Sequence, residues 1–283
     1  MGHMKIIRFL HQNQTRWGIL NEAQVVALDA RWPTLSEGLS QGVSALSAAA
    51  NVPASERIAL NEVQLLPPVD ENAKILCVGL NYGKHVRETG NAQAEHPSLF
   101  FRHLESFVGH EQSIVKPAHS DQFDYEGELV VVIGREGRHI QAENALEHVA
   151  GYTCMGENSV RDFQKHTAQV TAGKNFFHSG SLGPWIIPAT EISDPSVLHL
   201  TTRLNGQVVQ DASLSELIFS IPELIAYIST FCVLRPGDLI ATGTPEGIGF
   251  RRTPPLFMKE GDILEIEVSN VGVLRTPVIN EQL

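Results

Sequence analysis

The sequence predicts a strand-rich α+β fold with a small N-terminal domain and a larger second domain. Short apolar runs typical of strands outnumber the helical segments, and they do not alternate with helices in a regular βαβ order. No internal repeat recurs at a fixed period, which disfavours a solenoid. The length of 283 residues favours one large domain or two unequal ones. A connection at 66–70 that contains Pro67 and Pro68 is the expected boundary, which gives domains at 4–72 and 73–283.

The N-terminal domain begins with three expected strands. Residues 5–10, 16–20 and 24–28 are short apolar runs separated by polar turns. A Ser- and Ala-rich segment at 35–50 predicts a helix. The same segment contains a G-x-S-x-G pattern at 38–42, but no buried strand precedes it, so a nucleophile elbow is not expected there.

The second domain alternates buried strands with a few helices. Residues 74–79 and the β-branched run 129–133 predict core strands, and 237–242 and 261–268 predict strands that follow Gly-Asp turns. Helical spacing covers 143–150 and 214–231. Proline lacks the backbone N–H that a helix interior needs, so Pro222 is expected to start a new helix within the second segment.

Composition excludes several classes of protein. Hydrophobic residues make up 42% and charged residues 19%, which excludes a disordered chain, a collagen and a disulfide scaffold. The net charge of −11 makes nucleic acid and anionic membranes unfavourable partners. Three cysteines far apart in the sequence indicate reduced thiols in a cytoplasmic protein. No apolar run approaches a membrane span, no leader opens the chain, and residues 1–4 are typical of an expression scar.

The most specific chemical feature is an acidic motif directly before the strand at 129–133. In an extended chain Asp124, Glu126 and Glu128 project to one face, each about 6.5 Å from the next. Carboxylates this close repel one another unless a cation lies among them, and an all-oxygen site suits Mg²⁺, Mn²⁺ or Ca²⁺. The alternative is a strand edge whose charges point into water.

A second polar cluster lies at 156–164. Glu157 is a candidate third oxygen ligand, and Ser159 is expected to cap a short helix on which Arg161 and Gln164 share one face. The alternative for Arg161 is a surface ion pair with Asp162.

A third cluster pairs a histidine with a carboxylate. His85 and Glu88, three residues apart, touch on a helical turn, and the carboxylate then makes the imidazole a better general base. The alternative is a surface pair without function. Farther along, residues 243–249 are neither a P-loop nor a dinucleotide-binding motif, but the Thr244 hydroxyl and nearby backbone N–H groups suit an anion.

Taken together and in this order, these motifs resemble the fumarylacetoacetate hydrolase superfamily over about residues 74–277. The resemblance implies a β-roll catalytic domain, a homodimer, and a divalent cation held by Glu126, Glu128 and Glu157. It implies that His85 and Glu88 activate water on a lid at about 83–96. Lys174, with its surrounding Gly-Lys-Asn-Phe motif, is implied to stabilise an oxyanion. The resemblance further implies that substrate contacts come from Arg102, Arg161, Gln164 and Thr244.

The chain departs from the family pattern at two positions. Glu157 stands where the family usually has Asp in an Asn-Asp run, and the stretch 101–103 with Arg102 replaces a Phe-x-Lys-Pro stretch. A planar, forked Arg favours bidentate carboxylate contacts, so the expected consequence is a changed substrate preference.

The resemblance implies a metal-dependent hydrolase that cleaves the C–C bond of acylpyruvate-like or fumarylpyruvate-like 2-oxo acids, as in aromatic compound catabolism. In this hypothesis His85 activates the attacking water and the cation stabilises the enolate that departs. A decarboxylase of oxaloacetate-type acids and an isomerase or hydratase of unsaturated dicarboxylic acids are alternatives on the same site. A β-roll without catalytic activity that binds a metal or assembles is the alternative from another class.

Overall fold

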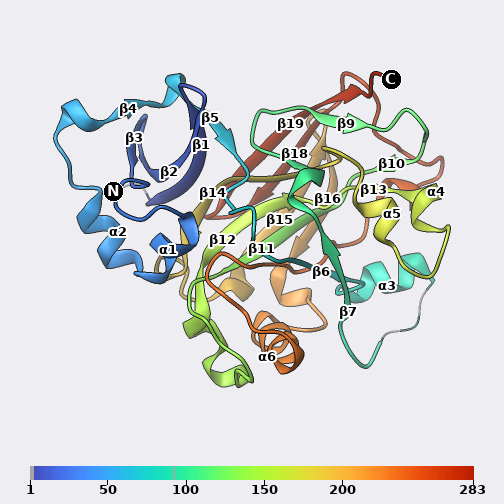
Figure 1. Ribbon diagram of the computed structural model, residues 1–283. Coiled ribbons are helices and arrows are strands. Elements are labelled where there is room, and N and C mark those ends of the chain that lie inside the picture. Colours follow the sequence, from blue (N-terminus) through green and yellow to red (C-terminus); the bar gives the residue numbers. More distant parts are fainter. Residues whose placement is uncertain (1–2, 91, 93) are drawn as a thin grey trace.

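The structure, a computed structural model, describes residues 3–90, 92 and 94–283, and most of its strands belong to one long sheet (Figure 1). In spatial order this sheet contains β4 (Ile58–Ala59), β3 (Gln24–Ala27), β2 (Gln14–Asn21), β1 (Lys5–His11), β14 (Gly180–Pro188), β12 (Val149–Gly156), β11 (Gly127–Ile133), β17 (Leu239–Ala241), β6 (Ile75–Gly79) and β7 (Ser98–Arg102). Two short strands join its side: β5 (Gln64–Leu66) pairs with β1 and β8 (Phe107–Val108) with β14. The prediction of a strand-rich α+β fold is confirmed.

Two smaller sheets complete the second domain. A five-stranded sheet contains β16 (Gln207–Ser213), β15 (His199–Leu204), β18 (Ile263–Val268), β19 (Gly272–Asn280) and β9 (Ile114–Lys116). It contacts the long sheet where β18 and β19 meet β12 and β14. The third sheet is the pair β10 (Phe123–Asp124) and β13 (Ser159–Val160), which lies beside the site described below.

The N-terminal strands extend the long sheet. β1 pairs antiparallel with β14 through Ile6 and Ile186, and one hydrophobic cluster contains both of these side chains. The domain boundary near residue 72 therefore separates two parts that share a sheet and a core, and it stays a prediction.

Strand β11 is the centre of the fold because both of its faces are covered. Leu129, Val131 and Ile133 belong to the cluster shared with the five-stranded sheet, whereas Val130 and Val132 belong to the cluster shared with the N-terminal strands. A strand buried on both faces is a continuous apolar run, as 129–133 is. Because alternate residues share a face, Glu128 projects to the side of Val130.

Two predicted helices differ in the structure. The segment 35–50 forms α1 (Leu35–Ser40) and α2 (Val43–Ala49), because Gly42 between them has φ +80°, which interrupts a right-handed helix. The segment 143–150 is a 3₁₀ helix over Ala142–His148 followed by β12, because Val149 pairs with Ile133 on β11. The new helix expected at Pro222 is confirmed as α6 (Ile221–Phe231), which Ser220 caps together with Glu223.

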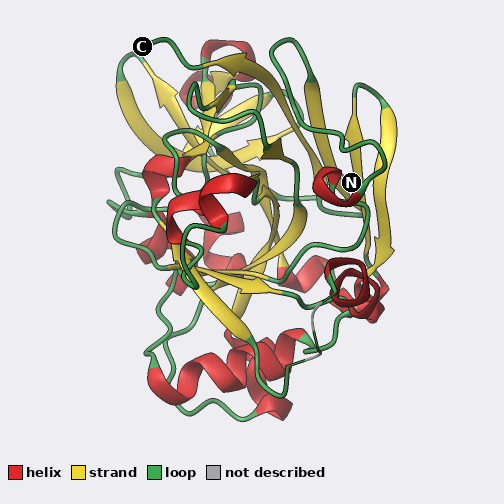
Figure 2. Cartoon of the chain, turned by 90° about the vertical axis from the view of Figure 1, so that its right-hand side faces the viewer, coloured by secondary structure: helices red, strands yellow, loops and turns green. Residues whose placement is uncertain are grey.

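Three short helices gather at one side of the long sheet. They are α3 (Gly83–Thr89), α4 (Arg161–Gln164) and α5 (Thr171–Lys174), on the right in Figure 1, and Figure 2 looks onto this side. All three contribute residues to the same cavity. No helix in the described part of the chain is both long enough and apolar enough to cross a membrane.

Candidate active site

A cavity of about 800 Å³ gathers most of the predicted site residues. Eight of the ten line it: His85, Glu126, Glu128, Glu157, Arg161, Gln164, Lys174 and Thr244. The other two, Glu88 and Arg102, do not line the cavity, but each contacts a residue that does. Residues more than a hundred positions apart in the sequence therefore meet at one place.

The backbone of β11 and β12 fixes the spacing of the inner carboxylates. Gly127 pairs with Gly156, and the backbone N–H of Glu157 donates to the carbonyl of Glu126 across 2.8 Å. A Cβ at Gly127 would lie 2.1 Å from the Thr202 hydroxyl oxygen, so only glycine fits this close approach. The backbone pairing of β11 with β12 thus holds together the two segments that carry Glu126 and Glu157.

Two buried cations neutralise Glu126. The ammonium of Lys174 forms ion pairs with both Glu126 and Glu157. Arg161 pairs with Glu126 through Nη2, and its Nη1 donates to Gln164 Oε1 across 2.9 Å, so the predicted shared face of α4 is confirmed. The alternative of a surface pair with Asp162 is wrong, because Arg161 is buried.

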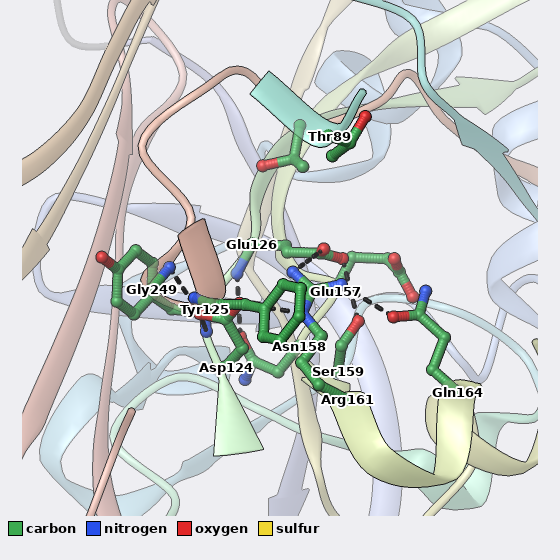
Figure 3. Close-up of polar contacts among 12 residues, drawn as sticks. Thr89, Asp124, Tyr125, Glu126, Glu157, Asn158, Ser159, Arg161, Gln164 and Gly249 are labelled. Atoms are coloured by element: carbon green, nitrogen blue, oxygen red, sulfur yellow. Dashed lines mark hydrogen bonds and ion pairs between the residues drawn. The ribbon is translucent and has the colours of Figure 1, made fainter. Parts of the chain in front are cut away.

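Asp124 does not face the cavity with the other two carboxylates of its motif. Its oxygens accept backbone N–H groups from Gly249 at 2.8 Å and Phe250 at 3.0 Å, and Arg161 Nε donates to it across 2.8 Å (Figure 3). The extended-chain prediction fails here because β10 pairs with β13 in another sheet, whereas β11 pairs with β12. Asp124 instead holds the guanidinium of Arg161.

Arg102 is another correction. The resemblance implied that it contacts substrate, but its side chain is fully buried behind Glu157. Nη1 donates to Glu157 Oε1 across 3.0 Å and to the Asn158 carbonyl across 3.2 Å, and further donors reach the Ser106 and Ser179 hydroxyls. The guanidinium does bind a carboxylate, as expected for Arg, but this carboxylate belongs to the protein. Arg102 and Glu157, the two residues that depart from the family pattern, therefore form an ion pair with each other.

Ser159 has a different role from the expected helix cap. It belongs to β13, α4 begins after Val160, and the Ser159 hydroxyl donates to Glu126 Oε2 across 3.2 Å. Glu126 thus accepts bonds from a hydroxyl, a guanidinium and an ammonium. The sequence position of Ser159, two residues after Glu157, carried no signal for this contact.

Charge and burial separate the three inner carboxylates. Burial raises the pKa of Glu128 well above its ordinary value, and the neighbouring Glu157 adds to the increase. Burial also raises the pKa of Glu157 to about 7, against the opposing effect of Lys174 and Arg102. Burial acts in the same direction on Glu126, but Arg161 and Lys174 outweigh it and hold the pKa of this carboxyl below its ordinary value. Glu128 pairs with no cation among the described residues.

The predicted contact between His85 and Glu88 is present on α3. Nδ1 of His85 lies 3.3 Å from Glu88 Oε2, and the Glu88 carboxylate also accepts the Gly247 backbone N–H, 3.1 Å from its other oxygen. His85 is buried and faces the cavity, whereas Glu88 lies behind it. Residues 91 and 93 of the predicted lid at 83–96 lie outside the described residues, and the motion of the lid stays a prediction.

The segment after β17 contributes Thr244 and Ile248 to the lining of the cavity. The sequence predicted that backbone N–H groups of this segment suit an anion. The Gly243 N–H donates to Glu128 Oε2 across 2.8 Å, so the group that it binds is a carboxylate of the protein. Gly243 has φ +107°, and a Cβ there would lie 2.8 Å from Asn81 Cβ. The Thr244 hydroxyl accepts a bond of 2.8 Å from Gln210, a residue that no sequence motif singled out.

Sequence motifs also missed three residues at the cavity mouth: Lys165, Phe250 and Arg251. Lys165 directly follows the Arg161–Gln164 motif, and Phe250 and Arg251 follow the glycine-rich segment 243–249. Only this adjacency could have signalled them.

The inner carboxylates fit a hard divalent cation by their chemistry. Four buried carboxylates share this region with three buried cations, which leaves one negative charge uncompensated in the fully ionised cluster: Asp124, Glu126, Glu128 and Glu157 against Arg102, Arg161 and Lys174. Oxygen ligands of this kind suit Mg²⁺ and Mn²⁺. The described residues nevertheless contain no His, Cys, Asp and Glu set already arranged around a metal position, because the Lys174 ammonium lies between Glu126 and Glu157.

Comparison with known proteins places the chain in a family. Residues 74–279 match the model of the fumarylacetoacetate (FAA) hydrolase C-terminal family, and residues 4–68 match an Rv2993c-like N-terminal model. The first match covers well over half of the chain. The protein belongs to the fumarylacetoacetate hydrolase family.

Individual members of the family show how far this similarity extends. The chain is 38% identical over 267 residues to human oxaloacetate tautomerase FAHD2A, mitochondrial, which covers 92% of this chain and 85% of the relative. A fumarylacetoacetate hydrolase structure from psychrophilic Exiguobacterium antarcticum has a TM-score of 0.85 and 32% identity, covering 98% of this chain and all of that one. A maleylpyruvate hydrolase structure from Sphingobium sp. SYK-6, in complex with manganese(II) ion and pyruvate, has a TM-score of 0.81 and 28% identity, covering 99% and 100%.

Proposed function

We propose that this protein is a divalent-metal-dependent enzyme that interconverts the keto and enol forms of a 2-oxo dicarboxylic acid of the oxaloacetate type. The observation that carries the proposal is the meeting of a buried base, His85, and a buried ammonium, Lys174, on one cavity with three carboxylates. The 38% identity to an oxaloacetate tautomerase supports the choice of reaction.

Enolisation needs a base at the carbon and positive charge at the oxygen. His85, oriented by Glu88, removes the proton from the carbon beside the keto group. In this proposal Lys174, which lines the same cavity, stabilises the negative charge that develops on the oxygen and donates the proton that converts the enolate into the enol. A divalent cation held here would supply Lewis-acid stabilisation of the same charge. Glu126, Glu128 and Glu157 are the residues that would hold this cation, Mg²⁺ or Mn²⁺.

C–C hydrolysis of an acylpyruvate-like or fumarylpyruvate-like acid is the second candidate. The His85–Glu88 pair favours it, because a histidine held by a carboxylate activates water as readily as it removes a carbon-bound proton. Both reactions pass through an enolate of a 2-oxo acid. Decarboxylation of the same acids needs neither an attacking water nor the removal of a carbon-bound proton. It therefore depends least on His85. Homodimer formation and a cytoplasmic location remain expectations from the sequence.

The test compares three reactions of two substrates, oxaloacetate and acetylpyruvate, on the protein loaded with magnesium or manganese. The loss of enol absorbance of oxaloacetate reports tautomerisation, and pyruvate release from acetylpyruvate reports hydrolysis. We expect rapid tautomerisation that His85→Gln abolishes. Pyruvate release from acetylpyruvate at a higher kcat/KM would favour hydrolysis, and no acceleration of either reaction would contradict both candidates. Carbon dioxide release from oxaloacetate that His85→Gln leaves intact would identify the decarboxylase.

A further inference from the structure

Two cations lie at the cavity mouth around one aromatic ring. The Lys165 ammonium is 3.7 Å and the Arg251 guanidinium carbon 5.2 Å from the centre of the Phe250 ring. All three residues line the cavity that contains the inner carboxylates. Contact with the ring face holds both cations near the opening.

Neither mouth cation has an acidic partner. Each inner cation pairs with at least one carboxylate, but no Asp or Glu of the described residues lies within ion-pair distance of Lys165 or Arg251. Arg251 Nη2 donates a hydrogen bond to the Thr89 carbonyl on α3. In a chain with net charge −11, this leaves positive charge available at the entrance of the cavity.

The two cations are attached to the elements that position the inner site. Lys165 directly follows α4, which carries Arg161. Arg251 lies in the turn whose N–H groups at Gly249 and Phe250 donate to Asp124. Asp124 in turn binds Arg161 (Figure 3). The mouth and the inner carboxylates are therefore held at a fixed separation through Asp124.

We propose that Lys165 and Arg251 form a second anion site, which binds the distal carboxylate of a dicarboxylic 2-oxo acid. The inference rests on the proposed function, which places the 2-oxo acid end of the substrate at the inner carboxylates. A cavity of about 800 Å³ is of the size that takes a drug-sized ligand, so the substrate has a longer chain than oxaloacetate. The phenyl ring of Phe250 lies beside the apolar part of that chain.

The test measures binding of matched acids without turnover. Isothermal titration calorimetry in the presence of magnesium compares 2-oxoglutarate, 2-oxoadipate and 2-oxopimelate with monocarboxylic 2-oxo acids of the same chain lengths. The double variant Lys165→Gln/Arg251→Gln removes both mouth cations from exposed positions. The control variant Arg138→Gln/Lys259→Gln makes the same charge change at two exposed cations outside the cavity.

For the wild-type protein and the control we expect a dicarboxylic acid to bind about tenfold or more tightly than its monocarboxylic partner, as for a hydrogen bond to a charged group. The mouth variant should lose that preference and bind the monocarboxylic acids as before. The proposal is overturned if the wild type shows no preference at any length, if the mouth variant keeps the preference, if the control loses it, or if no acid binds. A wild-type protein that prefers dicarboxylic acids but does not accelerate tautomerisation would contradict the proposed function and leave the second anion site standing.

Discussion

The inner wall and the mouth of the cavity are built in opposite ways. The inner wall consists of Glu126, Glu128 and Glu157 beside core strands, each no more than 4% exposed, and Arg161 and Lys174 are paired there. At the mouth, Lys165 at the end of α4 and Arg251 in a 3₁₀ turn are exposed, and neither pairs with a carboxylate of the described residues. Burial makes each inner charge depend on its partner, whereas water screens those at the mouth.

This contrast suggests a division of labour. The inner wall fixes the reaction, because removing one of its paired groups, Glu126, Glu157, Arg161 or Lys174, leaves a charge unpaired in a dry environment. The mouth selects the acid, because its charges can change at little cost to the fold. The variants below test that division, in order of decreasing effect.

Arg161→Met should cause the largest loss of stability. It leaves Asp124 and Glu126 without their shared guanidinium, and breaking a buried ion pair costs about 3–5 kcal/mol. Urea denaturation of the metal-free protein measures the free energy of unfolding. A loss below about 1 kcal/mol would show that the inner wall is no more sensitive than an exposed surface.

His85→Ala should leave the fold intact and abolish most of the tautomerase activity. His85 contacts Glu88 through one ring nitrogen, and general-base catalysis contributes about 10²–10⁴-fold to a rate. Stopped-flow measurement of enol loss gives kcat. Glu88→Gln is the matched variant, because it keeps the shape of the partner and removes its charge, and it should give a smaller loss of kcat. An unchanged kcat in His85→Ala would mean that another group is the base.

Arg102→Met should weaken metal binding without touching the cavity. Removing a residue that orients a metal ligand typically costs about 10–100-fold in affinity, and Arg102 orients Glu157. Titration with manganese, followed by calorimetry, measures this affinity. Arg102→Lys keeps the charge but not the fork that reaches Ser106 and Ser179, so its affinity should lie between those of the wild type and Arg102→Met. Equal affinities in all three proteins would contradict a positioning role.

Lys84→Met should have the smallest effect. This lysine lies on α3 close to His85, and its ammonium pairs with Glu216 at 2.7 Å, but its side chain is 52% exposed. Exposed pairs of this kind contribute little to stability. Thermal unfolding should give an unchanged Tm, and kcat should stay the same. A drop comparable to that of Arg161→Met would remove the distinction between the two regions.

Local spacing predicted the parts of the site that neighbours in sequence create. Alternation along a strand placed Glu126 and Glu128 on the same cavity, and helical spacing placed His85 beside Glu88. Apolar runs likewise predicted the core strands. Helix boundaries were less accurate, because the pairing of Val149 with Ile133 on β11 overrides helical spacing.

The ion pairs between distant segments could not be predicted from spacing. Arg161 meets Asp124 across 37 positions and Arg102 meets Glu157 across 55, and the pairing of β10 with β13 and the packing of β7 bring these residues together. The sequence showed that Arg102 and Glu157 depart from the family pattern. Only the fold shows that they touch.

Uptake of a divalent cation by the inner carboxylates is the claim on which the proposed chemistry depends. Calorimetric titration of the chelator-treated protein with manganese tests it most directly, with Glu128→Gln as the variant, because Glu128 is the inner carboxylate without a cation partner among the described residues. We predict one ion bound per chain in the wild type and binding at least about tenfold weaker in Glu128→Gln, as expected when one charged ligand is lost. No uptake by the wild type, or the same affinity in both proteins, would contradict the account.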